Sequence, residues 1–168
     1  MTDIRLVQQG VFPRQTEVSV DWMLLNNGTL DDNDALATAV IVALGTDRLA
    51  ARTDILPDPD STDRRGWWGD HEAEVIHNGW PIGTRLWLVK RDKITGAGAQ
   101  RGSLVARIDM YIREAIQPFL DRRIASRMDV RVERVGVERI DALVRLYRGP
   151  ELAVDLRYQV LWAGIVES

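Results

Sequence analysis

The feature that most constrains the fold is a long irregular segment in the middle of the chain, residues 52–82, which we call the tryptophan loop. It follows neither the period of a helix nor that of a strand, and prolines, glycines and acidic residues are spread along it. Segments of this kind are uncommon inside compact domains and are generally functional or disordered. The rings of Trp67, Trp68 and Trp80 argue against disorder, because they would stay in water unless the loop packs on its own domain or on a neighbour. The sequence leaves open which of the two covers them.

Regular elements are predicted before the tryptophan loop. A helix is expected over residues 34–44, because small and apolar residues follow one another almost without interruption until Gly45 ends the run. Apolar residues surround most of this helix, so we expect it to be buried on most sides. Residues 1–30 read as an extended N-terminal segment, with an alternating strand that includes Val18, Val20 and Trp22.

After the tryptophan loop, residues 84–89 read as a short strand or extended segment. A second helix is expected to begin after Ser103, because apolar residues recur every four positions from Leu104 onward. Pro118 cannot donate a hydrogen bond to the carbonyl four residues earlier. We therefore expect this helix to kink or end near Gln117 and to restart as a short turn.

The last third of the chain has the two-residue period of strands. Strands are predicted around residues 130–133, 143–147 and 152–162, separated by turns at 136–141 and 149–150. The third strand has the cleanest alternation, which would place six side chains on one face: Leu152, Val154, Leu156, Tyr158, Val160 and Trp162. We predict an α+β fold in one domain, residues 1–168, with two main helices packed on a small antiparallel C-terminal sheet and a long irregular central loop.

Composition and charge limit the possible functions. The 168 residues include no cysteine, which excludes disulfides, thiolate metal sites and cysteine nucleophiles. No apolar run approaches the roughly 20 residues that cross a bilayer, and the N-terminus lacks the pattern of a signal peptide, so no membrane partner is expected. Residues 1–80 hold 6 Lys and Arg against 14 Asp and Glu, whereas residues 81–168 hold 16 against 11. Complementary halves of this kind can orient a neighbour or another copy of the chain.

Candidate catalytic and metal-binding residues form no recognisable constellation. Asp70, His71, Glu72 and His77 crowd together, but the histidine spacing is not that of the helical zinc motif. The aspartates of residues 58–63 lack the glycine and the glutamate that a calcium loop would need at fixed positions. We therefore expect no catalytic residue, no metal and no cofactor.

Three segments carry a resemblance to a known family. They are Asp34-Ala35-Leu36-Ala37-Thr38-Ala39-Val40 running on to Leu44-Gly45-Thr46-Asp47-Arg48, then Arg65-Gly66-Trp67-Trp68-Gly69-Asp70, then Gly83-Thr84-Arg85-Leu86-Trp87-Leu88. On these residues the chain resembles the baseplate wedge protein of Mu-like phages, itself similar to the sheath initiator of contractile phage tails. The resemblance covers about residues 17–162, and the double-tryptophan segment is its most specific part. The Glu-Pro-Arg element of T-even-type initiators is missing, and Gln117-Pro118 is the nearest stretch.

The resemblance implies a structural subunit of the virion, located in the tail baseplate, assembled in the host cytoplasm and without enzymatic activity. Its implied partners are other baseplate wedge proteins, the tail sheath protein and the central hub and tube proteins, with six copies per tail. Sheath assembly would begin on it by strand addition at exposed edges, for which residues 152–162 and 4–12 are the candidates. The candidate interface residues are Trp67, Trp68, Trp80, Trp87, Arg65, Arg85, Leu152, Val154, Leu156, Tyr158 and Trp162.

Two other classes of function stay open. A tail-associated hydrolase or lytic factor would use a cleft in the tryptophan loop, with Glu72 and Asp70 as its acid and base. A DNA-contacting tail protein would need a basic surface, whereas the arginines of residues 122–134 are mixed with acidic residues. Direct nucleic-acid binding is therefore not expected.

Overall fold

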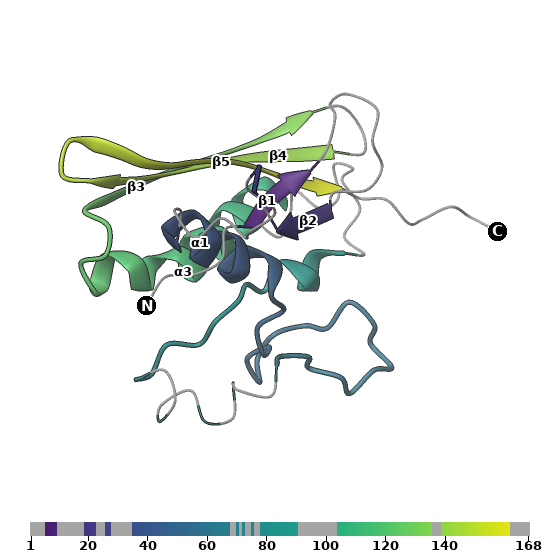
Figure 1. Cartoon of the computed structure of the whole chain (residues 1–168). Helices are drawn as coiled ribbons and strands as arrows, with labels where there is room; N and C mark the ends of the chain where they lie inside the picture. Colours follow the sequence, from purple (N-terminus) through teal and green to yellow (C-terminus); the bar gives the residue numbers. More distant parts are fainter. Residues whose placement is uncertain are drawn as a thin grey trace.

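The computed structural model describes residues 6–9, 19–22, 26–27, 35–67, 70, 72, 75, 78–90, 104–135 and 139–161. Within these residues, two α-helices and two antiparallel sheets form the fold. In chain order the elements are β1 (Leu6–Gln9), β2 (Ser19–Trp22), α1 (Ala35–Gly45), the 3-10 helix η2 (Leu86–Val89), α3 (Leu104–Asp121), β3 (Arg127–Val135), β4 (Arg139–Arg148) and β5 (Glu151–Leu161). Both α-helices lie on one face of the C-terminal sheet, as Figure 1 shows, so the predicted α+β arrangement is confirmed.

The core lies between α3 and the sheet, whose strand order is β3-β4-β5. Ile108, Ile112 and Ile116 of α3 have no exposed surface, which confirms the predicted four-residue period of this helix. Every second residue of β4 faces the helices and is almost fully buried: Ile140, Ala142, Val144 and Leu146. Helix α3 and the C-terminal sheet together therefore supply more than half of the buried core among the described residues.

Helix α1 begins and ends within one residue of its predicted bounds and packs against α3. Val40 and Leu44 are buried, whereas Val42 is 39% exposed, so the helix is covered on most but not all sides. The strand expected near residue 20 is β2, which pairs antiparallel with β1 rather than with the C-terminal sheet. The extended N-terminal segment thus contributes a separate two-stranded ribbon.

Of the two outcomes expected near Gln117, a kink or an end of the helix, the end is wrong, because α3 continues through Pro118 to Asp121. Pro118 lies in the last turn, where only one backbone bond is lost, and the next residue, Phe119, is anchored in the core with 2% of its surface exposed. The helix ends with a Schellman motif: the amide of Ile124 donates to the carbonyl of Phe119 at 2.9 Å, and that of Arg123 to Leu120 at 2.9 Å. Ser103, the expected cap, lies outside the described residues.

Arg123 occupies the left-handed position of this motif, with φ of 58°, where glycine is normally preferred. Arg123→Gly should raise the free energy of unfolding by about 0.5–1 kcal/mol, because glycine adopts this backbone conformation without strain. The Arg123 side chain is exposed, so its removal should cost little. Urea unfolding followed by circular dichroism measures the change. Arg122→Gly is the matched control and should destabilise, since Arg122 stacks on Trp80. Equal destabilisation by both substitutions would contradict the prediction.

The strand expected over residues 84–89 is wrong except at its first residue. Thr84 forms an isolated parallel bridge with Asp47, but residues 86–89 form η2, in which the amide of Leu88 donates to the carbonyl of Arg85 at 3.0 Å. A strand would send alternate side chains to opposite faces, whereas all four residues of η2 are buried. Successive side chains of a 3-10 helix point about 120° apart, so the burial of all four means that η2 is surrounded by the core.

The expectation that Leu152 shares a face with Val154 is also wrong. Leu146 pairs with Val154, but Tyr147 pairs with Leu152, so Ala153 is one extra residue in β5. A one-residue shift reverses the face of a side chain, and Leu152 is 51% exposed whereas Val154 is 5% exposed. The turn between β3 and β4 is also shorter than predicted, because β4 already begins at Arg139.

Candidate interaction site

The stretch that follows α1, residues 46–51, lies between two other segments of the chain and is bonded to both. On one side, the amide of Arg48 donates to the carbonyl of Thr84 at 3.1 Å, and the amide of Thr84 donates to the carbonyl of Thr46 at 2.9 Å. On the other side, the amide of Ala50 donates to the carbonyl of Arg64 at 3.0 Å. The middle of the tryptophan loop, at Arg64, and the chain just beyond its end, at Thr84, are thereby held against the same short stretch.

Gly83 stands at the closest of these approaches. Its φ is 111°, and a Cβ atom there would lie 2.7 Å from the carbonyl oxygen of Thr46. Only glycine tolerates this backbone conformation without strain, and only glycine leaves room for the neighbouring backbone. The position was not singled out from the sequence beyond its place in the third resemblance segment.

Asp70 closes the double-tryptophan segment. Its Oδ2 atom accepts hydrogen bonds from the amides of Leu49 at 3.1 Å and Trp67 at 3.2 Å. Gly66 makes the turn possible: its φ is 90°, and a Cβ atom there would lie 2.7 Å from Asp70 Oδ2 and 3.0 Å from Leu49 Cβ. The described part of this segment therefore packs on its own domain, and Trp67 is half-buried. Trp68 lies outside the described residues.

Arg65 and Trp87, two of the candidate interface residues, meet inside the chain. Arg65 forms an ion pair with Asp47, and its guanidinium group lies 5.0 Å from the centre of the Trp87 ring. Trp87 is 4% exposed, and its Nε1 atom donates to the carbonyl of Arg48 at 2.9 Å. The three resemblance segments are thus joined here, and the Trp87 ring belongs to the core.

Arg85 is a second junction, between the tryptophan loop and α3. Its guanidinium group donates to Asp54 at 2.8 Å and to Glu114 at 2.7 Å, and it lies 5.1 Å from the centre of the Tyr111 ring. Burial by itself lowers the pKa of Arg85, but the bonds to Glu114 and Asp54 outweigh it, so the pKa is raised. Arg48 adds a further ion pair to Glu114 at 3.2 Å. Asp54 and Glu114 were not anticipated, because their partner is distant in sequence.

Trp80 forms the third attachment of the tryptophan loop. Its ring meets the edge of Phe119 with ring centres 4.9 Å apart, and the guanidinium group of Arg122 lies 4.8 Å from the centre of the Trp80 ring. Arg122 also donates to the carbonyl of Asn78 at 2.9 Å. The loop is therefore fastened to its own domain near its beginning, middle and end, by Asp54, Asp70 and Trp80.

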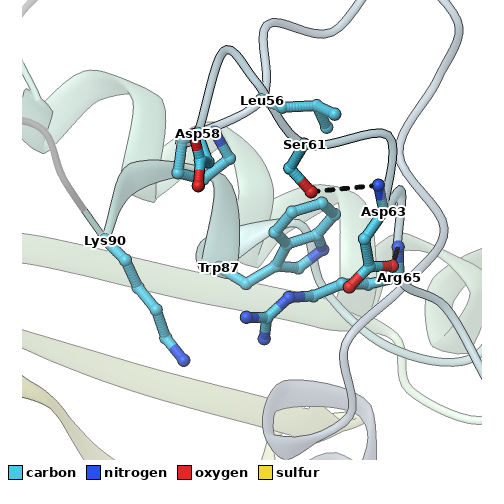
Figure 2. Close-up of a pocket in the computed structure, with 8 residues that line it drawn as sticks. Leu56, Asp58, Ser61, Asp63, Arg65, Trp87 and Lys90 are labelled. Atoms are coloured by element: carbon cyan, nitrogen blue, oxygen red, sulfur yellow. Dashed lines mark hydrogen bonds between the residues drawn. The ribbon is translucent and has the colours of Figure 1, made fainter.

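A pocket of about 230 Å³ opens between the tryptophan loop and η2 (Figure 2). Trp87 stands in its centre, with Asp58 and Ser61 on one side and Arg65 on the other. The lining residues are Leu56, Pro57, Asp58, Ser61, Asp63, Arg65, Trp87 and Lys90. Two of its carboxylates stabilise turns, because Asp58 and Asp63 accept hydrogen bonds from nearby amides at 3.2 Å and 2.8 Å.

The acid–base pair considered for a hydrolase gains no support from this geometry. Asp70 uses one carboxylate oxygen to hold two backbone amides, as a structural residue does, and Glu72 is exposed. Among the described residues, no group of three or more side chains is arranged to hold a metal ion. Nor does the described part of the chain contain a helix that is long and apolar enough to cross a membrane.

The sheet has two edges, β3 and β5. Arg113 of α3 reaches the β3 edge: its Nη2 atom donates to the carbonyl of Val130 at 2.8 Å, and its Nε atom donates to Asp109 at 2.7 Å. This bond was not predicted from the sequence, where Arg113 reads only as a residue on the outer face of its helix. Of the candidates on β5, Val154 and Leu156 face the core, Leu152 is exposed, and the side chain of Tyr158 and all of Trp162 lie outside the described residues.

Comparison with known proteins identifies the family of the chain. The family described as phage protein GP46 matches residues 36–152, well over half of the chain. The chain is also similar to the baseplate protein gp46 of Escherichia phage Mu, with 39% identity over 103 residues, which cover 61% of this chain and 63% of that protein. The similarity thus spans less than two thirds of the relative's length. The second and third resemblance segments, with the junctions that they form, lie inside the matched range, and the chain belongs to the phage protein GP46 family.

Proposed function

We propose that the chain is a structural subunit of a contractile phage-tail baseplate, located in the inner wedge, where it links hub and wedge proteins and initiates the tail sheath. The observation that carries this proposal is the similarity to a Mu protein that is itself a baseplate protein. A domain whose long loop is closed by its own ion pairs and rings suits such a role, because an assembly subunit has to present fixed surfaces to its neighbours. The proposed partners are wedge, sheath, hub and tube proteins, with six copies in the virion.

The contact with the sheath would be strand addition at β5. This strand is 11 residues long and forms one edge of the sheet, and an edge strand offers unpaired backbone groups to an added strand. The opposite edge, β3, is less suited, because Arg113 already bonds to the carbonyl of Val130. Of the candidate interface residues, Trp67 and Trp80 remain half-buried in the loop and keep part of their surface for a neighbour, whereas Trp87 and Arg85 serve internal contacts.

A proline scan of β5 tests this proposal. Successive amides of an antiparallel strand point alternately toward the paired strand and away from it, so of Arg157→Pro and Tyr158→Pro one removes only an outward amide. That variant should keep the fold and lose sheath assembly in a complementation assay, with at least about a tenfold drop in contractile particles. Arg131→Pro and Val132→Pro are the matched pair on β3. The one that removes only an outward amide should also remain folded, and it should still assemble the sheath. Normal sheaths from both folded variants would refute strand addition at β5.

A further inference from the structure

One row of side chains on the outer face of the sheet lies on the side away from the two described α-helices. Arg127 of β3 lies beside Tyr147 of β4, and Tyr147 lies beside Leu152 of β5. The Arg127 guanidinium group stacks on Tyr147, 3.9 Å from the ring centre. We call Arg127, Tyr147 and Leu152 the outer row. Both helices pack on the opposite face of the sheet, as Figure 1 shows.

The outer row has the composition of a binding surface. A single exposed leucine is ordinary, but Leu152 is placed there by the bulge at Ala153 and stands next to an aromatic ring. Tyrosine and arginine are enriched at protein interfaces, where the ring supplies contact area and the guanidinium group pairs with carboxylates. The stacking on Tyr147 holds the Arg127 cation in place before any partner arrives.

The complementary surface lies on the first part of the tryptophan loop, on Ile55, Asp58, Asp60 and Asp63, which we call the acidic lobe. Ile55 is 74% exposed, although it is a large apolar residue. Asp60 and Asp63 are exposed on either side of the Ser61 turn. Within the described part of the chain, no basic side chain pairs with the Asp60 carboxylate. The lobe therefore offers an exposed apolar side chain, Ile55, and the exposed carboxylate of Asp60.

The two surfaces lie at opposite corners of the molecule. In Figure 1 the tryptophan loop hangs below the helices on one side, and the turn between β4 and β5, next to the outer row, lies above them at the far end of the sheet. One copy therefore cannot join its own lobe to its own row. We propose that the outer row of one copy binds the acidic lobe of a second copy, with Ile55 against Leu152 and Tyr147 and with Asp60 facing Arg127.

This contact joins two different surfaces, so it is head-to-tail and generates a chain or a ring of copies rather than a symmetric dimer. It uses the charge difference between the two parts of the sequence, acidic in the tryptophan loop and basic in the sheet. Because its ionic part is exposed, it should weaken as salt is added. It does not depend on the baseplate proposal, since it concerns only copies of this chain.

Sedimentation velocity of the full chain over a concentration series, from about 1 µM to about 1 mM, tests this contact. At low salt the chain should self-associate, and Asp60→Arg or Arg127→Glu should each weaken association by at least about tenfold. An equal mixture of the two variants should recover association into alternating chains or rings. The natural row of Asp60→Arg meets the natural lobe of Arg127→Glu, and the reversed lobe of the first meets the reversed row of the second. A chain that carries both substitutions has a net charge of −3 again. It should associate as the natural chain does, because its reversed lobe meets the reversed row of the next copy.

Two controls separate this contact from a general effect of charge or folding. Arg131→Glu changes the net charge as Arg127→Glu does and lies on the same strand and face, but it leaves the outer row intact, so it should keep most of the association. Thermal unfolding should show that all variants remain folded. A monomeric natural chain at low salt, equal loss with Arg131→Glu, or the absence of a complex in the mixture would each overturn the proposal.

Discussion

Gly83→Ala should lower the free energy of unfolding by about 2–4 kcal/mol, which is a large fraction of the stability of a small domain. Two costs combine at this position. An alanine would be held at φ of 111°, a region that side chains disfavour, and its Cβ atom would press on the carbonyl of Thr46 at 2.7 Å. Because that obstacle is backbone within the bonded stretch 46–51, it cannot move aside without breaking bonds to Thr84.

Two other glycines separate these costs. Gly149 has φ of 62° but nothing within 4 Å of its Cβ position, so Gly149→Ala should cost only about 1 kcal/mol, from backbone strain alone. Gly45 has no obstacle and lies at the end of α1, so Gly45→Ala should be neutral within about 0.5 kcal/mol. Chemical denaturation of the three variants measures the order. A loss at Gly83 no larger than that at Gly149 would show that the close approach to Thr46 is unimportant.

Arg85→Met should lower the free energy of unfolding by about 2–3 kcal/mol, somewhat less than for a fully buried pair, because the site is partly open to solvent. The substitution keeps the apolar stem but leaves the carboxylates of Asp54 and Glu114 without their shared partner. The Arg85 and Asp54 side chains are 17% and 16% exposed, so water replaces the lost bonds only in part. Thermal and urea unfolding measure the loss.

An exposed pair provides the matched control. Arg145 forms an ion pair with Asp155 at 3.2 Å, and both side chains are exposed to solvent. Arg145→Met should therefore lower the free energy of unfolding by no more than about 0.5 kcal/mol. Arg85→Lys should recover only part of the stability, because one ammonium group cannot reproduce the planar fork that reaches both carboxylates. If Arg85→Met and Arg145→Met cost the same, Arg85 does not hold the tryptophan loop to α3.

The periodic parts of the fold were predictable because each has one dominant local cause. The four-residue period of residues 104–120 and the alternation of residues 130–133 are direct consequences of burial on one face. The helix α1 was predicted within one residue of its bounds, because an apolar run ends at Gly45. In these cases local preference and tertiary packing favour the same structure.

The errors occurred where tertiary packing decides. Residues 86–89 have strand-like composition, yet they form a 3-10 helix whose four side chains are all buried in the core. Pro118 has a known local effect, but Phe119 anchors the last turn of α3 and the helix continues. The alternation of residues 152–160 conceals the bulge at Ala153, because an extra residue shows only in the pairing with β4.

The internal junctions use residues of segments that resemble one family, but their contacts could not be predicted from the sequence. The double-tryptophan segment and the segment with Gly83 and Trp87 were identified as belonging together on their resemblance to one family, and the structure brings Arg65 to Trp87. Their partners, Asp47, Asp54 and Glu114, gave no sequence signal, since a single charged residue matches many others in a chain with 47 charged side chains. Long-range ion pairs have no local pattern.

The three attachments of the tryptophan loop also determine when it becomes ordered during folding. Asp54 meets Arg85 across 31 residues, Asp70 meets Leu49 across 21, and Trp80 rests on Phe119 of α3. Arg85 is itself held by Glu114 of α3, Leu49 follows α1, and Phe119 belongs to α3, so we expect the loop to become ordered after the helices have docked on the sheet. Contacts that form after the rate-limiting step slow unfolding without speeding folding. We therefore expect the loop to contribute kinetic stability to the folded chain.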